Sequence, residues 1–375
     1  MRKNRKSNLI PPGVDLARFG QNCWEIYQGG RTWLSEQSSR LIADQRSLRP
    51  QTLADFTGQA DVHSTLAVFI KAARIRREAM DHVLLAGPAG LGKTSLGYIA
   101  ARELGVKMHL TSGPVLSRPS DLTGLLLSLK HRDILFIDEI HRLNAVVEEL
   151  LYSALEDFRI DVIEANGRSA RSVERRIPRF TLIGATTQAG LLTKPLRERF
   201  GISICLNFYS EADLETIVSR GAQKLGVPIT ADGVSTIARS ARGTPRIACQ
   251  LLHRVSDFAL VGGAAAIDGA IAEKALQALK VDAEGLNATD RHYLMTIAMR
   301  FDGGPVGIES LAAALAESRE TIEDMIEPFL IQKGFVHRTP RGRALTAHAL
   351  EHLGLNDATR GSEQIGLFAQ EPANG

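Results

Sequence analysis

The chain has 375 residues, of which 44% are hydrophobic, and a formal net charge of +3. This length and apolar content allow two or three domains with hydrophobic cores, and so small a net charge does not by itself indicate a nucleic acid or membrane partner. No apolar run approaches the roughly 18 residues of a membrane span. The basic start lacks the apolar segment of a signal peptide, and the three cysteines lack metal-ligand spacing, so a reducing, cytoplasmic location is expected.

Residues 1–46 show no sustained periodicity and hold an unusual share of the aromatic residues. We predict a poorly ordered extension here. A short docking segment, or an upstream region that is not translated, are the alternatives. The aromatic residues concerned are Phe19, Trp24, Tyr27 and Trp33.

The organising motif is Gly87–Thr94, which reads GPAGLGKT and matches the P-loop pattern. The apolar segment 82–86 before it is typical of a buried parallel strand, and the segment 95–104 behind it has helical periodicity. In this setting, glycines let successive backbone N–H groups point at phosphate oxygens. We expect Lys93 to reach the β- and γ-phosphates of ATP and the Thr94 hydroxyl to hold Mg²⁺. The other binding candidates are Gly87, Gly90, Leu91, Gly92 and Ser95.

A second motif lies in segment 133–139, where an apolar strand ends in Asp138 and Glu139. A strand ending in two acids can be a mere turn signal, but behind a P-loop it is typical of a Walker B motif. We expect Asp138 to reach the Mg²⁺ shell and Glu139 to orient or deprotonate the attacking water.

The rest of the first half alternates between strands and helices. Apolar strands are predicted at 106–110 and 180–187, and amphipathic helices at 61–78 and 146–158. This order predicts a parallel sheet with helices on both faces, with ligands at the carboxyl ends of the strands. A hairpin turning at Asn166-Gly167 is predicted within 159–179.

The second half predicts two further units. Helices at 211–225, 233–240, 243–259 and 264–279 indicate a compact all-helical domain. Helices at 288–299, 307–316 and 319–332, followed by a basic hairpin at 334–346, indicate a winged helix. The last of these helices is acidic, whereas the hairpin has almost no acid nearby, so nucleic acid phosphates are expected to contact Arg338, Arg341 and Arg343. A basic hairpin on a protein-binding module is the alternative.

Taken together, these residues resemble the RuvB family of Holliday-junction branch-migration motors within the AAA+ ATPases. The resemblance covers roughly residues 48–355. Its most specific runs begin at Leu48, Asp81, Leu135, Gly184, Arg199, Arg242 and Arg338. It implies a large AAA+ ATPase domain at 47–209, a helical lid at 210–280 and a winged-helix head at 281–355. The sequence pattern adds the extension at 1–46, which is longer than usual for the family, and predicts a disordered tail at 356–375.

The resemblance also implies roles for matching residues. Thr187 resembles sensor 1 for the γ-phosphate, Arg199 resembles an arginine finger supplied to the neighbouring subunit, and Arg246 resembles sensor 2. It further implies adenine-side contacts at Leu48, Arg49 and Tyr209, a nucleotide-side segment at Glu156, Asp157 and Phe158, and DNA contacts at Arg338 and Arg343. The implied assembly is a homohexameric ring helicase on duplex DNA and Holliday junctions, acting in recombination and repair with the junction-binding protein RuvA.

One departure concerns that last partner. The family carries apolar residues on the hairpin strand thought to dock RuvA, whereas this chain reads Val173-Glu174-Arg175-Arg176-Ile177. We hypothesise a divergent copy in which RuvA docking is weakened or altered. Two other functions compete with the motor: a remodeller of protein substrates, and a DNA-bound nucleotide switch that hydrolyses ATP poorly. Against the switch, none of the residues expected to carry hydrolysis is missing.

Overall fold

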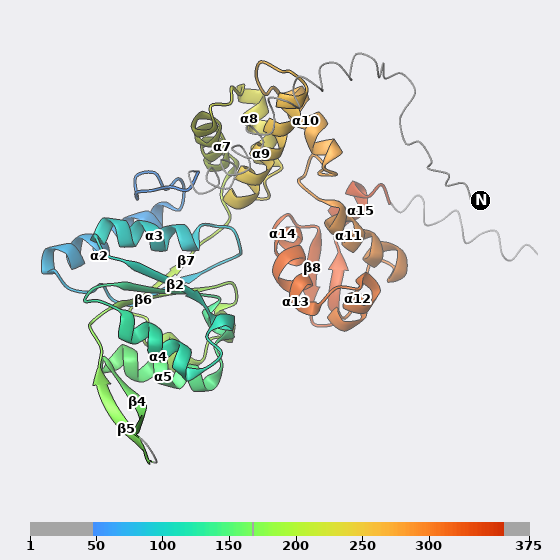
Figure 1. Cartoon of the computed structure of the whole chain (residues 1–375). Helices are drawn as coiled ribbons and strands as arrows, with labels where there is room; N and C mark the ends of the chain where they lie inside the picture. Colours follow the sequence, from blue (N-terminus) through green and yellow to red (C-terminus); the bar gives the residue numbers. More distant parts are fainter. Residues whose placement is uncertain (1–47, 167–168, 356–375) are drawn as a thin grey trace, which may run out of the picture. The chain divides into compact units, whose positions relative to one another are not determined.

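The computed structural model describes residues 48–166 and 169–355 (Figure 1). The predicted extension at 1–46 and the predicted tail therefore lie outside the described residues. The chain divides into two units, Met1–Arg49 and Pro50–Gly375, and every helix and strand given below belongs to the second unit. In the part of the chain that is described, no helix is both long and apolar enough to cross a membrane.

A five-stranded sheet forms the centre of the first domain. Its order is β2-β3-β6-β1-β7, and every neighbouring pair is parallel. The predicted parallel sheet is confirmed, but one edge strand was not predicted, because only alternate residues of it are buried. The strands are β1 Val83–Ala86, β2 Met108–Ser112, β3 Ile134–Asp138, β6 Thr181–Thr186 and the unpredicted β7 Ile202–Cys205.

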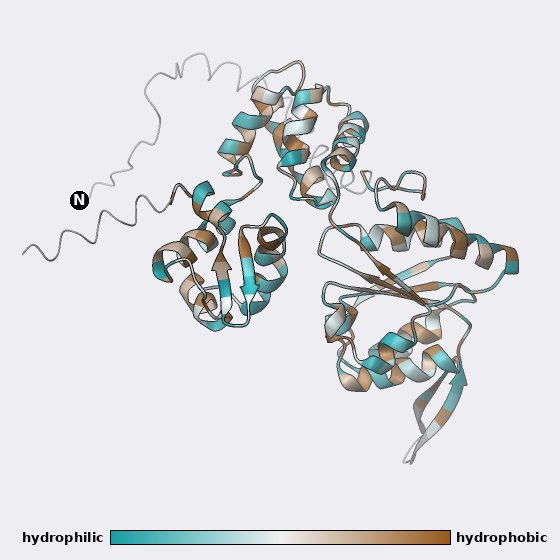
Figure 2. Cartoon of the chain, turned by 180° about the vertical axis from the view of Figure 1, so that it is seen from behind, coloured by the Kyte–Doolittle hydropathy of each residue, from teal (hydrophilic) through white to brown (hydrophobic). Residues whose placement is uncertain are grey.

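Helices cover both faces of this sheet, as predicted (Figure 1). Leu85 and Phe136 pack into the core beneath α2 and α3, whereas Leu84 and Leu135 pack into the core beneath α4 and α5. Because both faces are covered, the central strands β1, β3 and β6 are buried nearly throughout, and the centre of the sheet is coloured mainly brown in Figure 2. The helices are α2 Ala60–Arg76, α3 Lys93–Leu104, α4 Pro119–Ser128 (not predicted), α5 Ala145–Glu156 and α6 Lys194–Glu198, with short 3₁₀ turns at Gly113–Val115, Ile140–Arg142 and Ala189–Leu191.

The predicted hairpin is β4 Arg159–Asn166 paired with β5 Ser169–Arg176. The predicted all-helical domain consists of α7 Glu211–Leu225, α8 Ala231–Arg239, α9 Pro245–Val261 and α10 Gly269–Ala278. Side-chain oxygens of Ser210, Thr230 and Asp268 accept hydrogen bonds from first-turn N–H groups, which explains where α7, α8 and α10 begin.

The winged helix is confirmed, with two changes. The predicted helix 319–332 is interrupted by a π-helical turn, because Pro328 has no N–H and its ring would clash with the carbonyl of Asp324. A short last helix was also not predicted. The elements are α11 Ala288–Arg300, α12 Ile308–Leu315, α13 Arg319–Thr321, the π turn η4 Ile322–Ile326, α14 Glu327–Gln332, β8 Val336–Thr339, β9 Gly342–Leu345 and α15 Ala347–His352.

Candidate nucleotide-binding and catalytic site

The loop between β1 and α3 has the backbone that a phosphate cradle requires. Gly87, Gly90 and Gly92 have φ values of 136°, 84° and 100°, which favour glycine. A Cβ at Gly87 would lie 2.5 Å from the Leu206 carbonyl oxygen, so no other residue fits there. Gly92 caps α3 without a side-chain hydrogen bond, which leaves the N–H groups of the first turn for an anion.

The Lys93 ammonium lies inside this loop. Its Nζ donates to the carbonyl oxygens of Gly87 at 2.6 Å and Pro88 at 2.9 Å, and the residue is buried. Burial lowers the pKa of Lys93, and the nearby carboxylates of Glu139 and Asp138 oppose that shift. A buried cation whose hydrogen-bond partners are neutral carbonyls is well suited to bind an anion such as a phosphate.

Three adjacent strands deliver the predicted catalytic side chains to the same edge of the sheet. Asp138 is the last residue of β3, and Glu139 follows it with a φ of 47°. Thr187 follows β6, and its hydroxyl donates to Oε2 of Glu139 at 3.1 Å. The structure thus brings Lys93, Asp138, Glu139 and Thr187 together, as expected from parallel strands.

Two further residues at this edge were not singled out from the sequence. The Nδ1 of His141 lies 3.3 Å from Oε2 of Glu139 and 2.9 Å from the Thr186 hydroxyl. Both Thr186 and the His141 side chain are buried. The sequence signal was a histidine in the short segment that follows the Walker B strand. These contacts restrict the position of the Glu139 carboxylate.

The start of α9 also contacts the phosphate loop. The Arg246 N–H donates to the Gly90 carbonyl at 3.3 Å, and a Cβ on Gly90 would lie 2.6 Å from Cγ2 of Thr244. The Arg246 side chain is exposed, and its charge contributes to the lowered pKa of Lys93. Tyr209 is buried beside the loop, where its hydroxyl donates to the Leu91 carbonyl at 3.1 Å, and burial raises its pKa.

Other predicted residues lie at the opposite, amino-terminal edge of the sheet. Arg199 precedes β7. Its guanidinium pairs with Glu156 at 2.8 Å and donates to the Pro195 carbonyl, and its Cζ lies over the Tyr152 ring, 4.6 Å from the ring centroid. Phe158 packs edge-on against Phe180, just before β6. The structure therefore does not bring Arg199 or the segment 156–158 to the phosphate loop of the same chain.

Four residues remain of those expected to contact the nucleotide or Mg²⁺. Thr94 and Ser95 are half-buried in the first turn of α3. Leu48 and Arg49 belong to the unit Met1–Arg49, so their adenine-side contacts stay a prediction.

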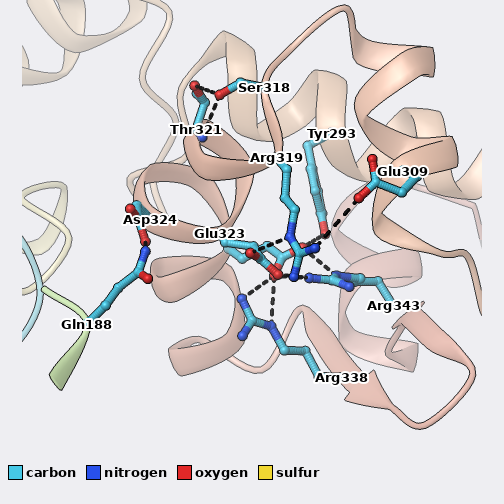
Figure 3. Close-up of polar contacts among 11 residues, drawn as sticks. Gln188, Tyr293, Glu309, Ser318, Arg319, Thr321, Glu323, Asp324, Arg338 and Arg343 are labelled. Atoms are coloured by element: carbon cyan, nitrogen blue, oxygen red, sulfur yellow. Dashed lines mark hydrogen bonds and ion pairs between the residues drawn. The ribbon is translucent and has the colours of Figure 1, made fainter. Parts of the chain in front are cut away.

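The wing of the winged helix differs from its sequence expectation. Arg343 pairs with Glu327 and Glu323 at 2.8 Å each, and Arg338 Nε donates to Glu327 at 2.8 Å. Figure 3 labels both arginines and Glu323. The expectation that these arginines have almost no acid nearby is therefore wrong, because the wing folds back onto the acidic helix. Arg341, at the turn between β8 and β9, is exposed.

Comparison with known proteins identifies all three domains. Residues 48–206 match the Holliday junction DNA helicase RuvB P-loop domain, 209–282 the RuvB AAA lid domain and 283–354 the RuvB C-terminal winged helix domain. The solved structure of the Thermotoga maritima RuvB Holliday junction branch migration motor is 48% identical, with 82% of this chain and 98% of that chain covered and a TM-score of 0.77. A lysine-to-arginine mutant of the same protein is 47% identical, covers 82% and 99%, and has a TM-score of 0.78.

The chain belongs to the RuvB family. The family is one of ATP-dependent Holliday junction helicases, so the predicted fold and enzyme class are confirmed, and the motor is favoured over the protein remodeller and the passive switch. As a RuvB-family P-loop domain, residues 48–206 bind nucleotide. The cradle fits a nucleoside triphosphate, because backbone donors, a buried ammonium and two carboxylates meet at one edge of the sheet.

Proposed function

We propose that this RuvB-family chain is a subunit of an ATP-hydrolysing ring that moves duplex DNA and drives Holliday-junction branch migration. In this proposal residues 47–209 hydrolyse ATP, 210–280 act as the lid and 281–355 bind DNA. The family match and the convergence of Lys93, Glu139 and Thr187 support it.

The observation that carries the ring is the separation of two groups in one domain. The phosphate loop follows β1, whereas Arg199 precedes β7, and these two strands are parallel neighbours with Val83 opposite Ile202. Arg199 therefore lies at the other edge of the sheet from its own phosphate loop. We infer that it serves the nucleotide of an adjacent copy, where an arginine finger contributes a rate factor on the order of 10³–10⁵.

Within one subunit, each residue has a defined task. Lys93 and the loop N–H groups bind the phosphates, and Glu139 orients and deprotonates the attacking water. Thr94 and Asp138 would hold Mg²⁺, which when bound neutralises charge developing on the phosphate oxygens. Arg246 lies in the first turn of α9, and its N–H donates to the Gly90 carbonyl, so a change at the phosphates reaches the lid through this contact.

The test is the ATPase rate measured against protein concentration, with and without duplex DNA, for wild type and Arg199→Ala. A ring motor gives a steep concentration dependence, stimulation by DNA and loss of activity in the variant. An ATPase rate per subunit that depends neither on protein concentration nor on DNA, and that is unchanged in Arg199→Ala, contradicts the proposal.

Docking of RuvA depends on the β4–β5 hairpin in the same proposal. Val173 lies opposite Val162, and both are half-buried, whereas Arg175 lies opposite the buried Ile160. Because residues alternate between faces, Arg175 interrupts the apolar face and Arg176 belongs to the other face. We therefore infer that Arg175 is the residue that weakens RuvA docking.

Affinity for the cognate RuvA, measured by calorimetry, tests this inference. Arg175→Ile should strengthen binding, because it extends the apolar face, and Arg176→Ile is the matched control on the other face. Equal effects of the two substitutions contradict it. So does a wild-type affinity as high as that of a family member with apolar residues on this strand.

A further inference from the structure

The side chain of Glu327, on the interrupted acidic helix, is completely buried where this helix meets the wing. It accepts hydrogen bonds from Arg338 Nε at 2.8 Å, Arg343 Nε at 2.8 Å and the Tyr293 hydroxyl at 2.9 Å. Figure 3 labels these three donor residues. Charge-assisted hydrogen bonds of this kind are short and directional. Three residues from three different elements therefore hold one carboxylate, and that carboxylate in turn fixes the orientation of their side chains.

The local chain geometry explains how Glu327 comes to lie there. It is the first residue of α14 and directly follows the π turn at Ile322–Ile326. Pro328 prevents a regular α-helix through this point. Glu323, four residues earlier, also reaches the guanidinium of Arg343, at 2.8 Å. The interrupted helix thus offers two carboxylates to the wing.

The two wing arginines are held in different ways. The Arg343 side chain is 12% exposed and pairs with both glutamates, so it cannot turn towards a phosphate without breaking both ion pairs. The Arg338 side chain is 48% exposed and uses Nε and Nη2 for Glu327. A guanidinium has five N–H donors in a rigid fork, so donors of Arg338 remain for a second anion.

The net charge of this ion-paired cluster on the helix and the wing does not explain why it would bind DNA. Glu309, Glu323 and Glu327 balance Arg319, Arg338 and Arg343 in a continuous chain of ion pairs, which leaves three acids against three bases. An arginine in a neutral cluster binds a phosphate well when its fork is already oriented, because less side-chain entropy is lost on binding.

We propose that Glu327 is a positioning residue for DNA binding. It holds Arg338 so that the remaining guanidinium donors meet a duplex phosphate, and its second pairing, with Arg343, fastens the wing to the helix. This inference rests on the proposed function, since it assumes that the winged helix binds duplex DNA.

The direction in which one substitution changes the affinity for DNA distinguishes positioning from simple electrostatics. Glu327→Gln removes a negative charge beside the wing, so electrostatics alone predicts tighter DNA binding. Positioning predicts weaker binding, by roughly tenfold. Glu320→Gln is the matched control, because Glu320 is an exposed acid at the start of the same interrupted helix. It should bind DNA as tightly as wild type or slightly tighter.

The experiment measures the affinity of the full chain for a fluorescent duplex by anisotropy at several salt concentrations. Arg338→Ala should weaken binding and reduce the salt slope by about 1. Glu327→Gln should have no further effect in the Arg338→Ala background, because Glu327 acts through Arg338. Tighter binding by Glu327→Gln, or additive effects of the two substitutions, overturns the inference.

A second variant covers the case in which Glu327→Gln unfolds the head. Arg338→Lys keeps the charge and Glu327 but loses the rigid fork, so it should bind DNA more weakly than wild type. Binding equal to wild type overturns the positioning role. If the wild type shows no salt-dependent binding to duplex DNA, the proposed function itself is wrong, and that result is distinct from any difference among the variants.

Discussion

The hydroxyl of Thr187 donates a hydrogen bond to Oε2 of Glu139 at 3.1 Å, and the Thr187 N–H points to the same oxygen at 3.4 Å. This pair joins the ends of β6 and β3 and so connects the residue expected to read the γ-phosphate with the residue expected to activate water. The side chain of Glu139 is 33% exposed, so it can change partner when nucleotide is bound.

Thr187→Val should lower kcat for ATP hydrolysis by about 10²-fold, the usual cost of one lost donor at a catalytic site. Nucleotide affinity should change little, because the loop and Lys93 are untouched. Steady-state ATPase kinetics and equilibrium binding of a fluorescent nucleotide measure the two quantities. Thr187→Ser keeps the hydroxyl and should keep most of the activity; a valine variant as fast as wild type would contradict this role.

Subunits lacking different halves of the site should complement each other. Arg199→Ala and Glu139→Gln should each abolish the ATPase activity of their own ring, and an equimolar mixture should regain part of it, because some sites then combine an intact Glu139 with an intact Arg199. Arg197→Ala is the matched control, since Arg197 donates to the Ala189 carbonyl and should be dispensable. A mixture as inactive as its components argues for an arginine acting in cis.

Lys93→Ala should remove the thermal stabilisation that nucleotide gives. Binding to the native state alone stabilises by about 2.7 kcal/mol at a ligand concentration of 100 Kd. We expect ATP with Mg²⁺ to raise the Tm of the wild type and to leave the Tm of Lys93→Ala unchanged, as measured by calorimetry. Lys71→Ala, on the exposed face of α2, should retain the full shift.

Two glycine substitutions should have opposite effects. Gly87→Ala introduces a Cβ 2.5 Å from a backbone oxygen at positive φ, so nucleotide binding should be lost and the free energy of unfolding should fall. A Cβ at Gly124, inside α4, meets nothing within 4 Å. Gly124→Ala should therefore raise the free energy of unfolding by about 0.5–1 kcal/mol. Denaturant unfolding distinguishes the two, and equal effects would refute the geometric argument.

The head should lose stability in acid through Glu323. Burial acts to raise the pKa of Glu323, but hydrogen bonds from Arg319 and Arg343 outweigh it, so the pKa lies below its usual 4.5. The stabilisation is therefore complete above pH 4.5 and is lost as the pH falls through the lower native value. Glu323→Gln should unfold at lower Tm near neutral pH, and its Tm should depend less on pH in acid. A variant with the same acid profile as wild type would refute this linkage.

The sequence by itself was sufficient to predict the three-domain architecture and the edge of the sheet at which the candidate site residues meet. Apolar strands alternating with helices require a parallel sheet, and a parallel sheet places the ends of β1, β3 and β6 side by side. Lys93, Asp138, Glu139 and Thr187 could therefore be grouped without coordinates. The edge strand β7 was missed because only Ile202 and Ile204 are buried, which leaves too short an apolar pattern.

The tertiary structure decided which charged side chains meet. Nothing local in the sequence pairs Arg338 or Arg343 with Glu327, because the contacts arise only when the β8–β9 hairpin folds back onto a helix broken at Pro328. The same holds for Arg199 and Glu156, which approach through the packing of α5 against α6. Hydrophobic periodicity is a property of neighbouring residues and can be recognised in the sequence. The partner of a charged side chain depends instead on the distance between elements, which only the folded chain defines.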